Sequence, residues 1–118
     1  MNRSAWFFVP LALVSLCSVA AQSAQPKVTF IELGSVNCIP CKMMQPVMKK
    51  AAEKYPGQVR VVFHDVWTAQ GEPYGRQYKV VGIPTQVFLD QNGKEYARHV
   101  GFFDFESLEK ILKSGGVN

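Results

Sequence analysis

The sequence predicts a single α/β domain, in which about three helices flank a four-stranded mixed sheet. Three observations lead to this prediction. Strand and helix patterns follow one another in the order β-α-β-α-β-β-α, a tight hairpin turn separates the last two strands, and 118 residues leave room for one modest core. The amino-terminal segment differs from the rest of the chain because it is almost wholly apolar.

The first strand and the first helix meet at a pair of cysteines. Residues 27–33 (KVTFIEL) are rich in β-branched and aromatic side chains, which predicts a strand. Residues 34–37 form a turn, in which Asn37 is placed to cap the following helix. Apolar positions then recur at helical spacing over residues 38–55, and Pro46 inside this run should kink the helix.

The rest of the chain supplies three more strands and two more helices. Residues 58–65 (QVRVVFHD) predict a strand that is hydrophobic enough to be buried on both faces. A looser segment follows and ends in a short helical stretch at 74–78. The remaining elements are the Gly82-Ile83-Pro84-Thr85 segment, a strand at 86–89, a hairpin turn at 90–93, a strand at 95–100 and an amphipathic helix at 105–113.

The amino-terminal residues have the pattern of a secretory signal peptide. Arg3 gives a short positive region, an apolar stretch runs from Ala5, and small side chains precede cleavage points after Ala21 or as late as Ala24. A periplasmic or otherwise exported protein is therefore predicted. The alternative is an uncleaved anchor, which would bring the protein to the membrane through this segment alone. The predicted organisation is a signal peptide at 1–21, a short lead-in at 22–26 and a domain at 27–118.

Cys38 and Cys41 enclose a two-residue loop at the start of the first predicted helix. A disulfide across so short a loop restricts the unfolded chain little and stabilises the folded protein by only about 2 kcal/mol, so the pair is poorly suited to act as a structural cross-link. Loss of the signal peptide would remove Cys17 and leave these two cysteines in a compartment where disulfides persist. Backbone N–H groups in the first helical turn favour a thiolate on Cys38, which predicts attack by Cys38 and resolution by Cys41.

A structural disulfide and a metal site are the alternatives for this cysteine pair. A structural zinc site usually needs four ligands, whereas the chain has no second CxxC, and His64 and His99 are single and far apart. No metal or other cofactor is therefore predicted. The net charge of +4 comes from scattered lysines and arginines, without interleaved aromatic residues, so no nucleic-acid partner is predicted.

The CxxC at the helix start, Pro46 five residues after Cys41, and the Gly82-Ile83-Pro84-Thr85 segment form a combination found in one family. In this combination the chain resembles the exported, periplasmic-type members of the thioredoxin superfamily with a CIPC active site, over roughly residues 27–113. The resemblance implies a shortened thioredoxin fold, because the strand and helix that open a full-length thioredoxin are not found before the CxxC strand.

The resemblance also implies roles for individual residues. The bond between Ile83 and Pro84 would be cis, Pro84 would pack beside the cysteines, and the Ile83 backbone would pair with an extended substrate chain. Ile39 and Pro40, between the cysteines, complete the implied substrate-binding set. Glu32 stands where thioredoxins commonly bury an aspartate that takes up and returns the proton of the second cysteine.

Three positions depart from the usual thioredoxin pattern. Asn37 stands where tryptophan is usual, Ile39 replaces a glycine, and the second strand lacks its usual lysine in residues 61–64. Pro40, before the second cysteine, matches the pattern of reducing members of the family.

The functional hypothesis from the sequence is an exported thiol–disulfide oxidoreductase that reduces protein disulfides through a Cys38–Cys41 dithiol/disulfide cycle. A monomer is expected, with protein disulfides as substrates and a membrane thiol–disulfide carrier as the source of electrons. The alternatives are a disulfide oxidase or isomerase, a non-catalytic thioredoxin-fold module that binds a peptide or partner protein, and a metallochaperone.

Overall fold

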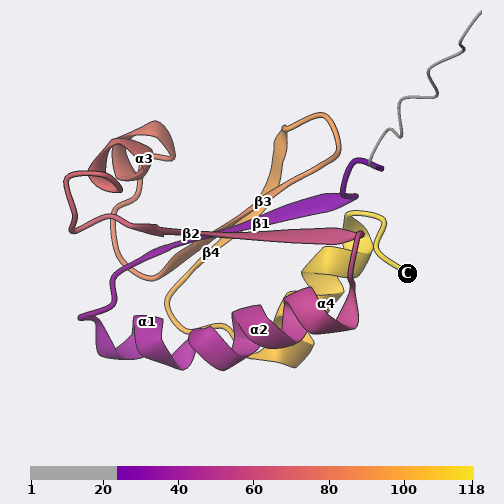
Figure 1. The fold of residues 1–118 in the computed structure, drawn as a ribbon, viewed down its shortest axis with the longest axis horizontal. Helices are drawn as coiled ribbons and strands as arrows, with labels where there is room; N and C mark the ends of the chain where they lie inside the picture. The colour runs from indigo at the N-terminus through magenta and orange to yellow at the C-terminus, as the bar shows by residue number, and fades with distance from the viewer. Residues whose placement is uncertain (1–23) are drawn as a thin grey trace, which may run out of the picture.

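The computed structural model describes residues 24–118, so the predicted signal peptide lies outside the described residues. Four strands form a mixed sheet in the order β2-β1-β3-β4 (Figure 1). The central strand β1 (Val28–Gly34) runs parallel to β2 (Val59–Asp65) and antiparallel to β3 (Thr85–Leu89). The last strand, β4 (Glu95–Val100), runs antiparallel to β3, which confirms the predicted four-stranded mixed sheet.

Helices cover both faces of this sheet. Figure 1 shows α1 (Ile39–Met43), α2 (Gln45–Lys54) and α4 (Phe105–Ser114) on one face, and α3 (Glu72–Gln77) on the other. The predicted α/β class is therefore confirmed, and the element order agrees with the prediction except that two helices, α1 and α2, stand in place of the first one. In the part of the chain that the structure describes, no helix has the length and apolar character needed to cross a membrane.

The helix predicted over residues 38–55 is divided in two at Met44. The backbone N–H of Met44 donates to the carbonyl of Cys41 (3.1 Å), while its carbonyl accepts from the N–H of Met48 (2.9 Å). Pro46 consequently lies in the first turn of α2, where a missing N–H breaks no intrahelical bond. The expected kink is thus a break between two successive helices.

The start of α1 also differs from the prediction. Cys38 is the N-cap residue, and its sulfur accepts a hydrogen bond from the backbone N–H of Cys41 (3.3 Å). Asn37 instead donates its backbone N–H to Ser35 Oγ (3.2 Å) within the preceding turn. The first cysteine therefore takes the capping role that the sequence assigned to Asn37.

The prediction that the strand at 58–65 is buried on both faces was wrong. β2 is an edge strand, and only Val59 of its seven residues is buried. An edge strand has a neighbour on one side only, so its hydrophobic side chains pack at the margin of the core. Val61 and Phe63 do so on the α2 side, and Val62 on the α3 side.

The larger core lies between the sheet and helices α2 and α4. Phe30 and Phe88 are fully buried at its centre and stack with 5.2 Å between ring centroids. The helices contribute Met44, Val47, Met48, Ala51, Leu108 and Leu112. A smaller cluster under α3 is built on Ile31, Leu33 and Val87.

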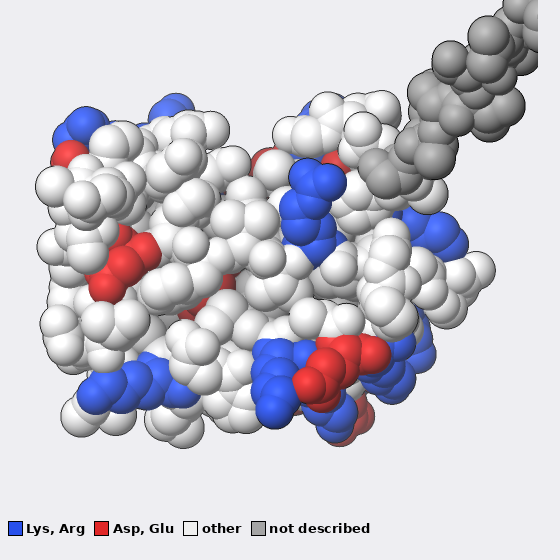
Figure 2. Space-filling view, in the orientation of Figure 1, with Lys and Arg blue, Asp and Glu red and all other residues white. Residues whose placement is uncertain are grey.

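Charged side chains lie on the surface with both signs interspersed. Figure 2 shows basic and acidic groups side by side at the lower right of the molecule. Ion pairs along and between α2 and α4 account for part of this mixing: Lys49 with Glu53, Lys54 with Glu109, and Lys110 with Glu106. The view shows no extended surface of a single charge, in agreement with the scattered charges of the sequence.

Truncation of a central core residue provides a test of this packing. We expect Phe88→Ala to lower the free energy of unfolding by about 3–5 kcal/mol, because a fully buried aromatic ring is replaced by a cavity. Phe102→Ala is the matched control, since Phe102 is 44% exposed, and its effect should stay below about 1 kcal/mol. Urea unfolding of the oxidised proteins measures both values. Equal losses in the two variants would contradict this description of the core.

Candidate redox active site

Cys38 and Cys41 form a disulfide at the start of α1, with 5.1 Å between their Cα atoms. Cys38 is 7% exposed and Cys41 only 1%, so the first sulfur is the more accessible of the two. Cys41 packs against the end of β1. A Cβ added at Gly34 would lie 3.1 Å from the Cys41 sulfur, closer than side chains normally approach. Glycine at this position therefore permits the close contact between the strand and the disulfide.

The turn before Cys38 is fixed by the end of β2. Gly34 and Asp65 are register partners, and the Gly34 carbonyl accepts from the N–H of Val66 (2.9 Å). The Asp65 carboxylate then accepts from the backbone N–H groups of Val36 (3.2 Å) and Trp67 (3.0 Å). Asp65 was not among the site residues predicted from the sequence. Its position at the end of a strand parallel to the CxxC strand was the available signal.

Glu32 lies in the middle of β1 and is fully buried. Side chains alternate along a strand, so Glu32 faces the same side as Gly34, roughly 7 Å further along, where Cys41 packs. Burial raises the pKa of Glu32 to about 8, while a hydrogen bond from Gln86 opposes this rise. The carboxyl is therefore protonated at neutral pH and close to the point at which it releases its proton.

Gln86 and His99 were not singled out as site residues by the sequence. Gln86 Nε2 donates to Glu32 Oε1 (3.3 Å), and Gln86 Oε1 lies 2.8 Å from His99 Nδ1. A glutamine within the apolar strand that follows Pro84 was a signal of an internal polar contact. Its partners could not be predicted, because they depend on the register between three strands.

The segment before β3 lies at the same end of the sheet as the disulfide. The bond between Ile83 and Pro84 is cis, as the resemblance implied, and Pro84 is buried. Thr85, the next residue, is the register partner of Leu33, so Pro84 lies beside the carboxyl end of β1. The Pro84 carbonyl accepts from the N–H of Gly101 (2.7 Å), which ties this segment to the end of β4.

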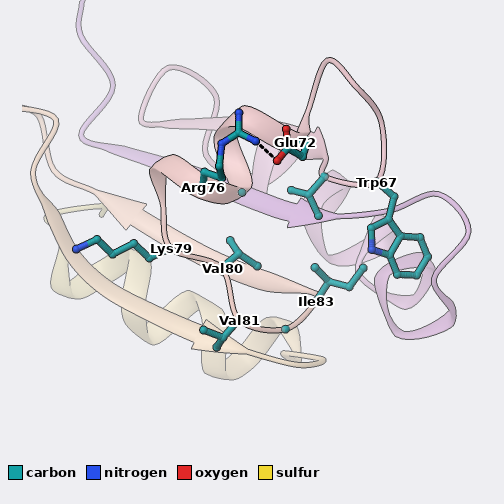
Figure 3. A pocket seen from close by; sticks show the side chains of 10 residues that line it. Trp67, Glu72, Arg76, Lys79, Val80, Val81 and Ile83 are labelled. Carbon is teal, nitrogen blue, oxygen red and sulfur yellow. Dashed lines mark hydrogen bonds and ion pairs between the residues drawn. The ribbon is translucent and has the colours of Figure 1, made fainter.

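A groove of about 400 Å³ runs beside Ile83, between α3 and the segment that leads into β3. Figure 3 shows Trp67 and Ile83 on one side of it and the Glu72–Arg76 ion pair, along α3, on another. Both apolar and charged groups therefore line the space next to the Ile83 backbone. Its remaining lining residues are Val66, Gly75, Lys79, Val80, Val81 and Gly82.

Exposed apolar side chains surround the cysteines. Ile39 is 75% exposed, although it lies between the two cysteines, and Pro40 next to it is exposed as well. Apolar side chains that together form a contiguous exposed patch often mark a place where another molecule binds, whereas single exposed ones are normal. The other exposed large apolar side chains at this end of the molecule include Val36, Met43, Trp67 and Val81.

Within residues 24–118 no group of three or more His, Cys, Asp or Glu side chains is arranged to hold a metal ion. The sequence predicted no metal site, and His64 and His99 lie on opposite faces of the sheet. His64 shares its face with Leu33, whereas His99 shares its face with Gln86 and Glu32.

A dithiol/disulfide pair at a helix start, a buried carboxyl beside it and a cis-proline segment at the same sheet end define a thioredoxin-type redox site. Comparison with known proteins agrees with this class. The family model described as "Thioredoxin-like domain" matches residues 16–116. The chain belongs to the thioredoxin-like family, as a redox protein with a CxxC disulfide.

Individual relatives lead to the same family. The chain is 34% identical over 83 residues to the SPbeta prophage-derived thioredoxin-like protein YosR of Bacillus subtilis, covering 70% of this chain and 92% of the relative. It is 35% identical over 92 residues to a thioredoxin of Chlamydia trachomatis, covering 78% and 86%. These relatives indicate thiol–disulfide oxidoreductase chemistry.

Solved structures support the fold. A mutant thioredoxin from Halobacterium salinarum is similar with a TM-score of 0.68 at 26% identity, covering 78% of this chain and 77% of its own. Oxidised mitochondrial thioredoxin 3 from Saccharomyces cerevisiae is similar with a TM-score of 0.65 at 30% identity, covering 78% and 82%.

Burial of Glu32 predicts a stability that depends on pH. The unfolded carboxyl loses its proton near its ordinary pKa of 4.5, whereas the folded carboxyl keeps it up to about 8. Stability should therefore fall as the pH rises between these values and level off above them. Glu32→Gln removes this dependence, so we expect it to stabilise the oxidised protein by about 2–4 kcal/mol at pH 9 and little at pH 4.5.

Urea unfolding at pH 4.5, 7 and 9 measures this difference. Glu53→Gln, at an exposed position on α2, is the control and should show no such trend. A difference between Glu32→Gln and the parent protein that is the same at all three pH values would contradict the raised pKa.

Proposed function

We propose that the protein is an exported thiol–disulfide oxidoreductase that reduces disulfides in other proteins. The observation that carries the proposal is the Cys38–Cys41 disulfide at the start of α1, with Glu32 buried on the sheet face against which Cys41 packs. Thioredoxins among the relatives support the chemistry, and the apolar leader of the sequence supports export.

The catalytic cycle begins with the reduced pair. The Cys38 thiolate attacks one sulfur of a substrate disulfide, forms a mixed disulfide and releases the other substrate sulfur as a thiolate. The backbone N–H of Cys41, which donates to the Cys38 sulfur at 3.3 Å, stabilises negative charge on that sulfur. Cys38 is also more exposed than Cys41, which favours attack by the Cys38 sulfur. Cys38 is therefore the nucleophile.

The second step releases the substrate. In the fraction of molecules whose Glu32 is ionised, a fraction that grows as the pH approaches about 8, the Cys41 thiol gives its proton to this carboxylate and attacks the Cys38 sulfur. The second substrate sulfur leaves as a thiolate, and the Cys38–Cys41 disulfide forms. The substrate gains two electrons and the protein loses two. A membrane thiol–disulfide carrier then returns them to the protein by the reverse exchange.

The exposed surface around the pair supports binding of an extended substrate chain. Ile39 and Pro40 would contact residues beside the substrate disulfide, while the backbone of Ile83 would pair with the substrate next to Pro84. The groove beside Ile83 offers both apolar and charged contacts to side chains that flank the disulfide (Figure 3).

Cysteine variants test the proposed reaction. In insulin reduction with a chemical dithiol, we expect Cys38→Ser to lose nearly all catalysis, because the attacking sulfur is gone. Cys41→Ser should instead accumulate a mixed disulfide with substrate, visible by mass spectrometry, because the resolving sulfur is gone. Full activity in the Cys38→Ser protein would refute the proposal.

The reduction potential of the Cys38–Cys41 pair tests the direction of electron flow. A value closer to about −270 mV than to about −120 mV would fit a reductant, and a value closer to about −120 mV would favour an oxidase.

Export is tested separately on the full chain. Expressed in a bacterium with a periplasm, the protein should be recovered from the periplasmic fraction with an intact mass that lacks residues 1–21 or 1–24. The Cys17→Ser chain is the control and should be processed in the same way, because Cys17 serves only as an apolar residue of the leader. Recovery of the unprocessed chain in the cytosol would refute export.

A further inference from the structure

Four side chains form a row across one face of the sheet, one from each strand. Glu32 on β1 is the register partner of Phe63 on β2 and of Gln86 on β3, and Gln86 is the register partner of His99 on β4. Register partners in neighbouring strands point to the same face. This face is the one on which α1 and Cys41 pack, so the row leads from the redox pair to the half-buried His99 at the sheet edge.

The buried amide of Gln86 uses all of its hydrogen-bonding groups. Its Nε2 donates to Glu32 Oε1 (3.3 Å) and to the carbonyl of Gly101 (3.1 Å), and its Oε1 faces His99 Nδ1 (2.8 Å). A carbonyl oxygen can only accept hydrogen bonds, so the end of the Gln86 amide that faces the Gly101 carbonyl must be its NH2 group. The amide oxygen therefore faces His99, whose Nδ1 must carry a hydrogen.

The ring of His99 is itself held in place. It stacks on Phe103 with 3.9 Å between ring centroids and an angle of 9° between the planes. The backbone N–H of Phe103 donates to the Met44 sulfur (3.3 Å), and Met44 is fully buried. Packing against the core therefore holds the His99 ring, and with it the Nδ1 atom that faces the Gln86 oxygen, in position.

The orientation of the amide matters to Glu32. An N–H that donates to a carboxyl group favours its ionised form, whereas an amide oxygen in the same place would favour the protonated form. The other oxygen of Glu32, Oε2, is buried without a hydrogen-bond partner among the described residues. Gln86 is consequently the polar side chain that stabilises the carboxylate against the effect of burial.

Most of the neighbours of Glu32 on this face of the sheet do not titrate. Phe63 on β2 and the Cys38–Cys41 disulfide at α1 have no ionisable group, and His99 on β4 is the titratable member of the row. No charged group among the described residues contributes to the shift at Glu32. The charged side chains of α1 and α2 are exposed, namely Lys42, Lys49, Lys50, Glu53 and Lys54.

We infer that Gln86 is a positioning residue, oriented by His99 and Gly101, which sets the pH at which Glu32 exchanges a proton with Cys41. This inference rests on the proposed function of the Cys38–Cys41 pair. His99 acts only through Gln86 in this arrangement. Both the neutral ring with hydrogen on Nδ1 and the charged ring donate from Nδ1, so the orientation of the amide is the same in either state.

The test measures Glu32 directly in the oxidised protein, by carboxyl carbon NMR between pH 4 and pH 10. We expect Gln86→Leu to move the midpoint of Glu32 titration upward by about one pH unit, because the donor to the carboxylate is lost. His99→Phe keeps the stacking on Phe103 but removes the Nδ1 donor, and should move the midpoint in the same direction. This second variant keeps the test decisive if Gln86→Leu does not fold.

Two further variants separate orientation from other effects. His99→Asn places an amide N–H near the position of Nδ1 without a titratable ring, and should restore the midpoint of the parent protein. His64→Phe removes the histidine on the opposite face, which stacks on Tyr74, and should leave the midpoint unchanged. An unmoved midpoint in both Gln86→Leu and His99→Phe overturns the inference. Failure of His99→Asn to restore the midpoint overturns the orienting role of His99.

The pH–rate profile of disulfide reduction by the same variants tests the link to Cys41. The profile should shift in the direction of the Glu32 midpoint, and a shifted midpoint with an unshifted profile overturns that link. An inactive parent protein refutes the proposed function instead, and the NMR result then still decides whether Gln86 controls Glu32.

Discussion

Glu32 occupies the centre of the sheet with no exposed surface, and the charge state of its carboxyl is decided by its neighbours. Taking an ionisable group out of water favours its neutral form, unless hydrogen bonds or opposite charges offset the loss of hydration. Among the residues that the structure describes, the only such group around Glu32 is the amide of Gln86. The closeness of Gly34 to Cys41 then brings the disulfide onto the same face of β1. Strand register and helix packing thus place a weakly acidic group beside a redox pair.

The fold was largely predictable from the sequence because its signals are local. Strand patterns at β1 and β4, the Asp90–Gly93 turn, and the helical spacing of the closing helix each depend on a few neighbouring residues. The break at Met44 was less predictable. Proline excludes a continuous helix, but whether it kinks the helix or begins a new one depends on how the next turn packs. Edge or central position in a sheet also depends on strand order, which explains the error on β2.

The candidate site was predictable to the extent that it lies in contiguous motifs. Cys38, Cys41 and the Ile83–Pro84 segment could be identified in this way, and Glu32 could be placed beside them by resemblance. The functions of these residues in this chain remain predictions. Gln86, His99 and Asp65 could not be identified, because their contacts join residues 13 to 54 positions apart in the chain. Only the register of the strands brings these side chains together.

The Gln86 amide has a consequence for the medium in which the protein works. A carboxyl whose ionisation is controlled by a nearby charge responds to ionic strength, because dissolved ions screen that charge. An amide is a neutral dipole in direct contact with Glu32, and the sheet excludes dissolved ions from the space between them. Proton exchange at Glu32 should therefore be nearly independent of salt concentration. The export proposed for this protein would therefore leave the acid–base behaviour of Glu32 the same in dilute and in saline surroundings.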